Sequence, residues 1–162
     1  MNIRPAARIV LLNEQSRLLL FKMEDQFVIS ETNPDGRPVW FTVGGGLEEG
    51  ETYEAAAKRE LWEETGLKDV EWGPFVWIRE VDVVFKGELT RFVEHYRIAR
   101  MKGTEIHLNH LTVEEKQGYL THHWWSIDEL RESTELIFPK KLAELLEPIL
   151  EGKITKTPIL ID

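Results

Sequence analysis

Apolar residues in the first part of the chain form short β-prone runs that are separated by turn-forming residues. The runs at residues 7–12 and 17–21 flank Asn13-Glu14-Gln15-Ser16, which predicts a hairpin. A third short run at residues 39–43 predicts a strand that leads directly into three glycines. The segment before it, residues 31–38, is rich in turn formers and predicts a surface loop.

Two longer apolar runs follow in the middle of the chain. Residues 75–85 and 89–101 are joined at Lys86-Gly87-Glu88, and this arrangement predicts a second hairpin. A further short strand is predicted at residues 122–126.

Helical patterns appear after the glycines and again near the end of the chain. Residues 52–65 predict a helix, because Thr52 can cap its start and Gly66 fits the position after its end. Pro139 fits the first position of a last helix, whose apolar residues recur at helical spacing. This order of elements predicts an α/β (α+β) fold, in which helices pack on a mixed sheet within one domain of residues 1–162.

Composition narrows the classes of function. The chain has 162 residues, 42% of them hydrophobic, which suits one domain with a sizeable core. A net charge of −9 argues against binding of nucleic acid polymers and of anionic membrane surfaces. The absence of cysteine excludes disulfides, zinc–thiolate sites and cysteine nucleophiles. Without a signal-like or membrane-spanning apolar run, a cytoplasmic protein is expected.

The segment of residues 44–67 carries seven glutamates and only two basic residues, Lys58 and Arg59. Helical geometry places Glu60, Glu63 and Glu64 within an arc of about 100°. Such a stripe can be read as a solvated helix face. It can also be read as a site for a hard divalent cation, since Mg²⁺ takes carboxylate oxygens and would reverse the mutual repulsion.

The glycines and one arginine are compatible with the second reading, although a glycine triplet alone is also typical of a simple turn. Gly44, Gly45 and Gly46 allow a ligand to approach the backbone closely, and a carbonyl there offers a further oxygen ligand. Arg59 lies beside the acidic stripe and is placed to pair with Glu51, just ahead of the helix.

The joint spacing resembles the Nudix box. That motif reads Gly-x5-Glu-x7-Arg-Glu-aliphatic-x-Glu-Glu-x-Gly-aliphatic, and every fixed position is filled between Gly45 and Leu67. One departure is Val43, where many relatives have proline before the glycines. The order of elements also resembles a Nudix domain. The resemblance therefore implies an α/β/α sandwich with a mixed, partly antiparallel sheet and the box helix packed against it.

Roles for individual residues follow from the resemblance. It implies that Glu60 and Glu64 are the first ligands of Mg²⁺ (or Mn²⁺), with Glu63 as a further ligand and Gly45 contributing its carbonyl. Glu51 and Arg59 would brace the box. The general base often lies outside the box, and the position nine residues before the paired tryptophans selects Glu115. Glu115 can alternatively be a solvated residue of a polar loop or short helix.

Candidate substrate contacts are spread over the rest of the chain. Strand alternation places Glu94 among apolar neighbours, where it is either a site residue or the partner of a basic residue on a neighbouring strand. Rings that could stack on a flat group, and arginines that could meet phosphate, are Phe27, Trp40, Tyr96, Arg37 and Arg91. The aromatic rings can equally belong to the core.

The resemblance implies a metal-dependent hydrolase of a small-molecule diphosphate, such as a nucleoside triphosphate, a nucleotide sugar or a dinucleoside polyphosphate. It also makes a homodimer one of the expected assemblies. The alternative is a Nudix-fold ligand sensor or interaction module without turnover. Retention of the box carboxylates favours the enzyme.

Overall fold

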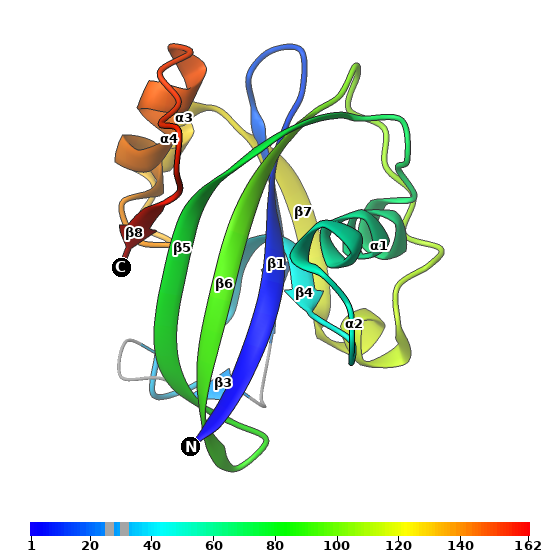
Figure 1. The fold of residues 1–162 in the computed structure, drawn as a ribbon, viewed down its shortest axis with the longest axis vertical. Coiled ribbons are helices and arrows are strands. Elements are labelled where there is room, and N and C mark those ends of the chain that lie inside the picture. Colours follow the sequence, from blue (N-terminus) through cyan, green and yellow to red (C-terminus); the bar gives the residue numbers. More distant parts are fainter. Residues whose placement is uncertain (25–27, 30–32) are drawn as a thin grey trace.

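The computed structural model describes residues 1–24, 28–29 and 33–162, and within them eight strands form one sheet (Figure 1). The strand order is β3-β5-β6-β1-β4-β2-β7, and β8 pairs with β5. β1 (Asn2–Leu12) runs parallel to β6 (Glu88–Arg100), and β8 (Ile159–Ile161) runs parallel to β5 (Glu71–Phe85). The remaining pairings are antiparallel, so the sheet is mixed, as the sequence predicts.

The first predicted hairpin is only partly formed. β1 and β2 (Leu18–Met23) pair at a single position beside the turn, Leu12 with Leu18. Beyond that point β4 (Val39–Gly46) inserts between them and pairs with both strands. The glycines at the end of β4 are thereby placed at the centre of the sheet, next to β1.

The second predicted hairpin is confirmed. β5 and β6 pair along most of their length, and Phe85 lies opposite Glu88. The connection has two residues, Lys86 with φ 50° and Gly87 with φ 81°. Positive φ at both central residues is the geometry of the tight turns that match the twist of paired strands. β3 (Val28–Ile29) pairs with β5 at this end of the hairpin.

The helix that follows the glycines is also confirmed. α1 (Tyr53–Thr65) begins after Thr52, whose side chain accepts a hydrogen bond from the backbone N–H of Ala55. It ends at Gly66, which has φ 74°, a left-handed conformation that favours glycine. The remaining helices are α2 (Val113–Gly118), α3 (Ile127–Glu132) and α4 (Leu142–Leu150), and β7 (Tyr119–Trp125) separates α2 from α3.

The start of the last helix differs from the prediction. Pro139 precedes α4 rather than forming its first position, and α4 continues through Pro148. The apolar stripe is nevertheless real, because Leu142, Leu146 and Ile149 are buried. Within the described residues, no helix is both long and apolar enough to span a bilayer.

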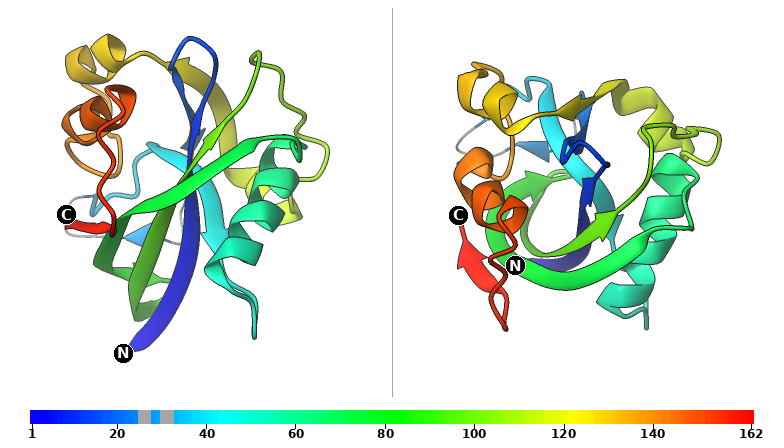
Figure 2. Two further views of the ribbon diagram at one scale, coloured as in Figure 1. Left: turned by 45° about the horizontal axis from the view of Figure 1, so that its top comes forward. Right: turned by 90° about the horizontal axis from the view of Figure 1, so that it is seen from above.

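Helices lie on both sides of the sheet (Figure 2), and an apolar core packs against each of its two faces. One core packs α3 and α4 against one face, through residues such as Leu130 and Leu146. The other packs α1 against the opposite face, through Ala56, Ala57 and Leu61. The result is the layered arrangement of helix, sheet and helix that the resemblance implies.

Candidate active site

A cleft of about 660 Å³ opens where the glycines of β4 meet α1 and α2. One end of the cleft is acidic and is lined by Glu60, Glu63, Glu64 and Glu115. The lining also includes aromatic rings, such as Phe85 and Phe92, and basic side chains, such as Arg4, Arg8 and Arg79. The cleft thus combines carboxylates that attract a cation with side chains suited to an anionic or flat group.

The acidic end begins with two buried glutamates of α1. Ala56 and Ala57 have no exposed surface, so this face of the helix packs closely on the sheet. Glu60 and Glu64 continue the same face at a spacing of four residues, and they are only 6% and 7% exposed. The reading of these two residues as a solvated helix face is therefore wrong.

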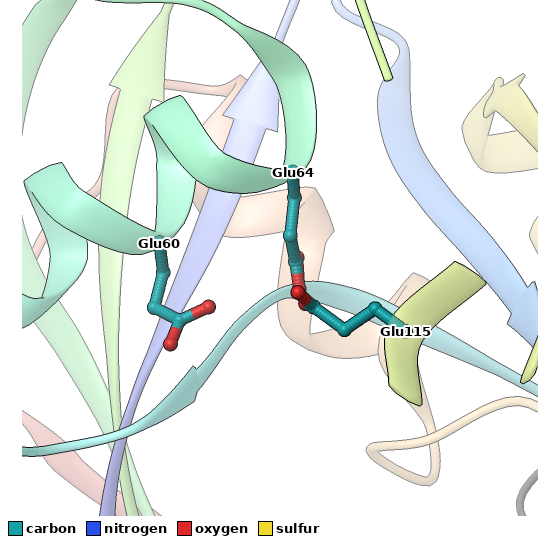
Figure 3. A group of neighbouring side chains, drawn as sticks. All are labelled: Glu60, Glu64 and Glu115. Atoms are coloured by element: carbon teal, nitrogen blue, oxygen red, sulfur yellow. The ribbon is translucent and has the colours of Figure 1, made fainter. Parts of the chain in front are cut away.

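A third carboxylate comes from α2, on the opposite side of the cleft (Figure 3). One oxygen from each of Glu60, Glu64 and Glu115 lies within 4.8 Å of the other two. Figure 3 shows Glu64 and Glu115 pointing toward each other from different helices. The structure therefore brings Glu115, the residue selected outside the box, close to Glu60 and Glu64 of the box.

Burial and mutual repulsion make these carboxylates hard to ionise. Burial, the largest effect, raises the pKa of Glu60 to about 7, with Glu115 and Glu63 adding to the rise and Arg59 opposing it. The pKa of Glu64 is raised well above its usual value, first by burial and then by Glu60 and Glu115. A group of carboxylates held in this way is complementary to positive charge.

The glycines are required by close contacts rather than by a turn alone. The backbone N–H of Gly44 donates to Oε2 of Glu64 at 3.0 Å. A Cβ added to Gly45 would lie 2.6 Å from Oε1 of Glu60, so the Glu60 carboxylate would have to move. Glycine at these positions therefore lets the loop and the helix approach each other with Glu60 and Glu64 in place.

Arg59 connects the loop to the helix. Its Nε and Nη2 donate to the two carboxylate oxygens of Glu51, each at 2.8 Å, and Nη2 also donates to the carbonyl of Gly46 at 2.9 Å. The same guanidinium donates through Nη1 to Glu60 at 2.8 Å and to Glu63 at 3.2 Å. Hydrogen bonding to Arg59 is the main cause of the lowered pKa of Glu51.

The oxygen donors fit a hard divalent cation. Glu60, Glu64 and Glu115 offer carboxylate oxygens and no nitrogen or sulfur, which is the ligand set of Mg²⁺ or Mn²⁺. Glu63 lines the cleft but lies outside this group of three, and one of its oxygens accepts from Arg59 at 3.2 Å.

Glu94 lies in the cleft wall and is 3% exposed. Its Oε2 accepts from Nε of Arg8 at 2.9 Å, and its Oε1 accepts from Nη1 of Arg79 at 2.7 Å. Burial works to raise the pKa of Glu94, but the two arginines outweigh it and the pKa is lowered. The sequence predicts that Glu94 is either a site residue or the partner of a basic residue on a neighbouring strand. The structure shows the second, because Glu94 pairs with Arg8 and Arg79.

The structure corrects two of the expected stacking residues. Trp40 is 5% exposed and packs edge-on against Trp125 at a ring distance of 5.0 Å. Tyr96 is 2% exposed, and its hydroxyl donates to Glu94 at 3.3 Å. Neither lines the cleft, because both face the apolar core beneath α3 and α4. Phe27 lies outside the described residues.

The two arginines proposed as phosphate contacts are in different places. Arg37 lines the cleft. Arg91 does not line it, and instead donates to both oxygens of Asp82 at 2.8 and 3.1 Å on the exposed surface. The expectation for Arg91 is therefore wrong, because its side chain is already paired and points away from the cleft.

Sequence reasoning missed two arginines and one capping motif. Arg8 interrupts an apolar run that is buried on both sides, and Arg79 follows another such run. A charge in such a run needs a partner, and that signal was available. Thr112 and Glu115 also form a capping box at the start of α2, which the spacing of threonine and glutamate would have predicted.

Comparison with known proteins shows the family of the chain. The family model for the NUDIX domain matches residues 2–146. The chain belongs to the NUDIX domain family. Among curated relatives, the phosphatase NudJ of Escherichia coli K12 is 46% identical over 44 residues, which are 27% of this chain and 29% of the relative. The match thus spans less than a third of that protein.

Solved structures share the NUDIX fold over nearly the whole chain. The E. coli dihydroneopterin triphosphate pyrophosphohydrolase has a TM-score of 0.63 at 17% identity, covering 94% of this chain and 99% of its own. A NUDIX hydrolase from Nitrosomonas europaea has a TM-score of 0.62 at 19% identity, covering 94% of this chain and 92% of its own. Identity this low establishes the fold and leaves the substrate open.

Proposed function

We propose that this NUDIX chain is a divalent-cation-dependent hydrolase of a small-molecule diphosphate. It would cleave the pyrophosphate linkage of a nucleoside diphosphate derivative, such as a nucleoside triphosphate, a nucleotide sugar or a dinucleoside polyphosphate. The observation that carries this proposal is the group of three carboxylates, two buried on α1 and one on α2, at the acidic end of the cleft.

In the proposed site, Glu60 and Glu64 hold the cation, Mg²⁺ or Mn²⁺, with the Gly45 carbonyl as a neutral oxygen donor and Glu63 as a further ligand. Glu115 lies beside them, within reach of water next to the cation. When bound, the cation supplies charge neutralisation at the phosphoryl oxygens and lowers the pKa of bound water.

The residues of the chain position the reaction. Arg59 fixes Glu51, Glu60 and the carbonyl of Gly46 relative to one another, so the loop and helix present a fixed surface to the diphosphate. Glu115 acts as the general base and takes a proton from the attacking water. The water oxygen bonds to phosphorus, the bond from phosphorus to the bridging oxygen breaks, and the leaving phosphate keeps that electron pair.

We also propose that residues 1–162 form one domain that acts in the cytoplasm. Its substrate would be a small molecule rather than a nucleic acid polymer, and a homodimer is the assembly to test. The aromatic and basic side chains that line the cleft support a substrate that carries a flat or anionic group beyond the diphosphate.

A panel of diphosphate compounds tests the proposed activity. Each compound is incubated with the full chain and Mg²⁺ or Mn²⁺, and phosphate-containing products are separated and identified. We expect cleavage at the pyrophosphate linkage that stops when the cation is chelated. Binding of cation and compound without turnover on any member would instead support the ligand sensor.

A further inference from the structure

The least expected feature of the cleft wall is a buried charged network on the strands, away from the box. Glu94 has side-chain exposure of only 4%, and its arginine partners Arg8 and Arg79 have 15% and 10%. Removing three charged groups from water costs several kcal/mol per ion, and a buried ion pair is weak evidence for added stability. The arrangement is therefore better explained by what the arginines hold in place.

Arg8 extends the network to the glycines. While its Nε donates to Glu94, its Nη1 donates to the carbonyl of Gly44 at 3.2 Å and to the carbonyl of Thr42 at 3.3 Å. These carbonyls lie where β4 runs into the glycines, so one guanidinium joins β6 to the loop. A planar fork with several donors suits such a contact, whereas a lysine offers a single charged point.

Gly44 carries the connection to the acidic end. Its carbonyl accepts from Arg8, and its N–H donates to Oε2 of Glu64 at 3.0 Å. Gly44 has φ 145°, and a Cβ there would lie 2.1 Å from the carbonyl oxygen of Ala7. The backbone at Gly44 is thus held from both sides, by Arg8 through one peptide group and by Glu64 through the other.

We propose that Arg8 is a positioning residue, which fixes the Gly44 backbone and thereby sets the position of the Glu64 carboxylate for cation binding. Glu94 orients Arg8, and Arg79 holds the other oxygen of Glu94 from β5. This inference rests on the proposed function, because it assigns a role in holding the same cation. Groups that orient metal ligands from outside typically change metal affinity about 10–100-fold when altered.

Binding of Mn²⁺ alone, without substrate, separates this role from a direct contact with substrate. Free Mn²⁺ is measured by its paramagnetic resonance signal during titration of the wild type and of Arg8→Lys, which keeps the charge and removes the fork. We expect Arg8→Lys to bind Mn²⁺ about tenfold more weakly. Arg91→Lys is the control, since Arg91 also pairs with a carboxylate, Asp82, but lies outside the cleft, and this substitution should leave Mn²⁺ affinity unchanged.

A second measurement addresses folding and the function itself. Circular dichroism fixes a temperature at which all variants are folded, and amide hydrogen exchange of Gly44 is followed by NMR without any cation. Faster exchange of Gly44 in Arg8→Lys supports the proposal. Unchanged Mn²⁺ affinity with a higher KM would overturn it and make Arg8 a substrate contact. If the wild type binds no Mn²⁺, the proposed function fails. The hydrogen exchange of Gly44 still tests this inference in that case, and an unchanged exchange rate in Arg8→Lys would overturn it.

Discussion

Glu64 accepts a hydrogen bond from the backbone N–H of Gly44 at 3.0 Å, across 20 residues of sequence. The contact joins the end of β4 to the buried face of α1 and leaves the other carboxylate oxygen for different partners. It explains why the glycines and the glutamates of the box must occur together. The helix supplies the charge, and the loop fixes where that charge lies.

Substitution of Gly45 tests whether stability and cation binding depend on the close approach of the loop to α1. In Gly45→Ala the new methyl group would overlap Oε1 of Glu60, so Glu60 must move. We expect a loss of about 1–3 kcal/mol in the free energy of unfolding and a large loss of cation affinity. The control is Gly50→Ala, where a Cβ meets nothing within 4 Å and only the positive φ is strained. Normal cation binding by Gly45→Ala would contradict the account.

Replacement of Arg59 should uncouple the loop from α1. Lysine cannot donate to Glu51, Gly46 and Glu60 at once, so Arg59→Lys should lose about 1–3 kcal/mol of stability and most of its turnover. Urea unfolding and the hydrolysis assay measure the two effects. Lys58→Arg at the exposed neighbouring position serves as a control for surface changes on the same helix. Full activity in Arg59→Lys would mean that the brace is not needed.

The two roles of Glu115 can be separated. Glutamine can replace glutamate in a capping box, so Glu115→Gln should keep α2 and the melting temperature while lowering kcat at least about 100-fold. Thr112→Val removes the cap but keeps the carboxylate, and should lower stability more than kcat. Near-normal kcat in Glu115→Gln would place the general base elsewhere.

The raised pKa values of Glu60 and Glu64 predict how stability depends on pH without a divalent cation. In the folded state these groups hold protons that the unfolded chain has lost. Their contribution to the free energy of unfolding is therefore complete below pH about 4.5, the usual pKa of glutamate. It is lost as pH rises through about 7, the folded pKa of Glu60. A pKa difference of one between the folded and unfolded chain corresponds to about 1.4 kcal/mol of stability.

Thermal melts in chelator between about pH 5 and about pH 8, which span the folded pKa of Glu60, measure the effect. The wild type should lose stability relative to Glu64→Gln as pH rises, and added Mg²⁺ should restore it at the upper pH. Parallel curves for the two proteins would show that Glu64 is not held protonated in the folded state.

The box itself could be predicted from sequence because its constraints are local. Glu60 and Glu64 lie four residues apart on one helix, so helical geometry alone places them on one face. The caps at Thr52 and Gly66 fix where that helix begins and ends. The contribution of α2 depends on the family resemblance, which selected Glu115 outside the box. Glu115 lies with Glu60 and Glu64, whereas Glu63 of the box lies outside this group.

The substrate end could not be predicted because it depends on which strands become neighbours. Insertion of β4 between β1 and β2 brings Arg8 next to Gly44, and the hairpin of β5 and β6 brings Arg79 next to Glu94. Alternation shows that Tyr96 shares a face with Glu94, but it does not show where the cleft ends and the core begins. That boundary is why the ring of Tyr96 is buried while Glu94 lines the cleft.

The most direct test of the central claim compares two glutamates of α1 in the cation-dependent hydrolysis of the best diphosphate substrate. Glu64 is buried in the carboxylate group, whereas Glu54 is exposed in the first turn of the same helix. Glu64→Gln and Glu54→Gln each remove one negative charge. The account predicts that Glu64→Gln lowers kcat/KM at least about 100-fold while remaining folded, and that Glu54→Gln matches the wild type. Equal turnover by Glu64→Gln and the wild type would contradict it.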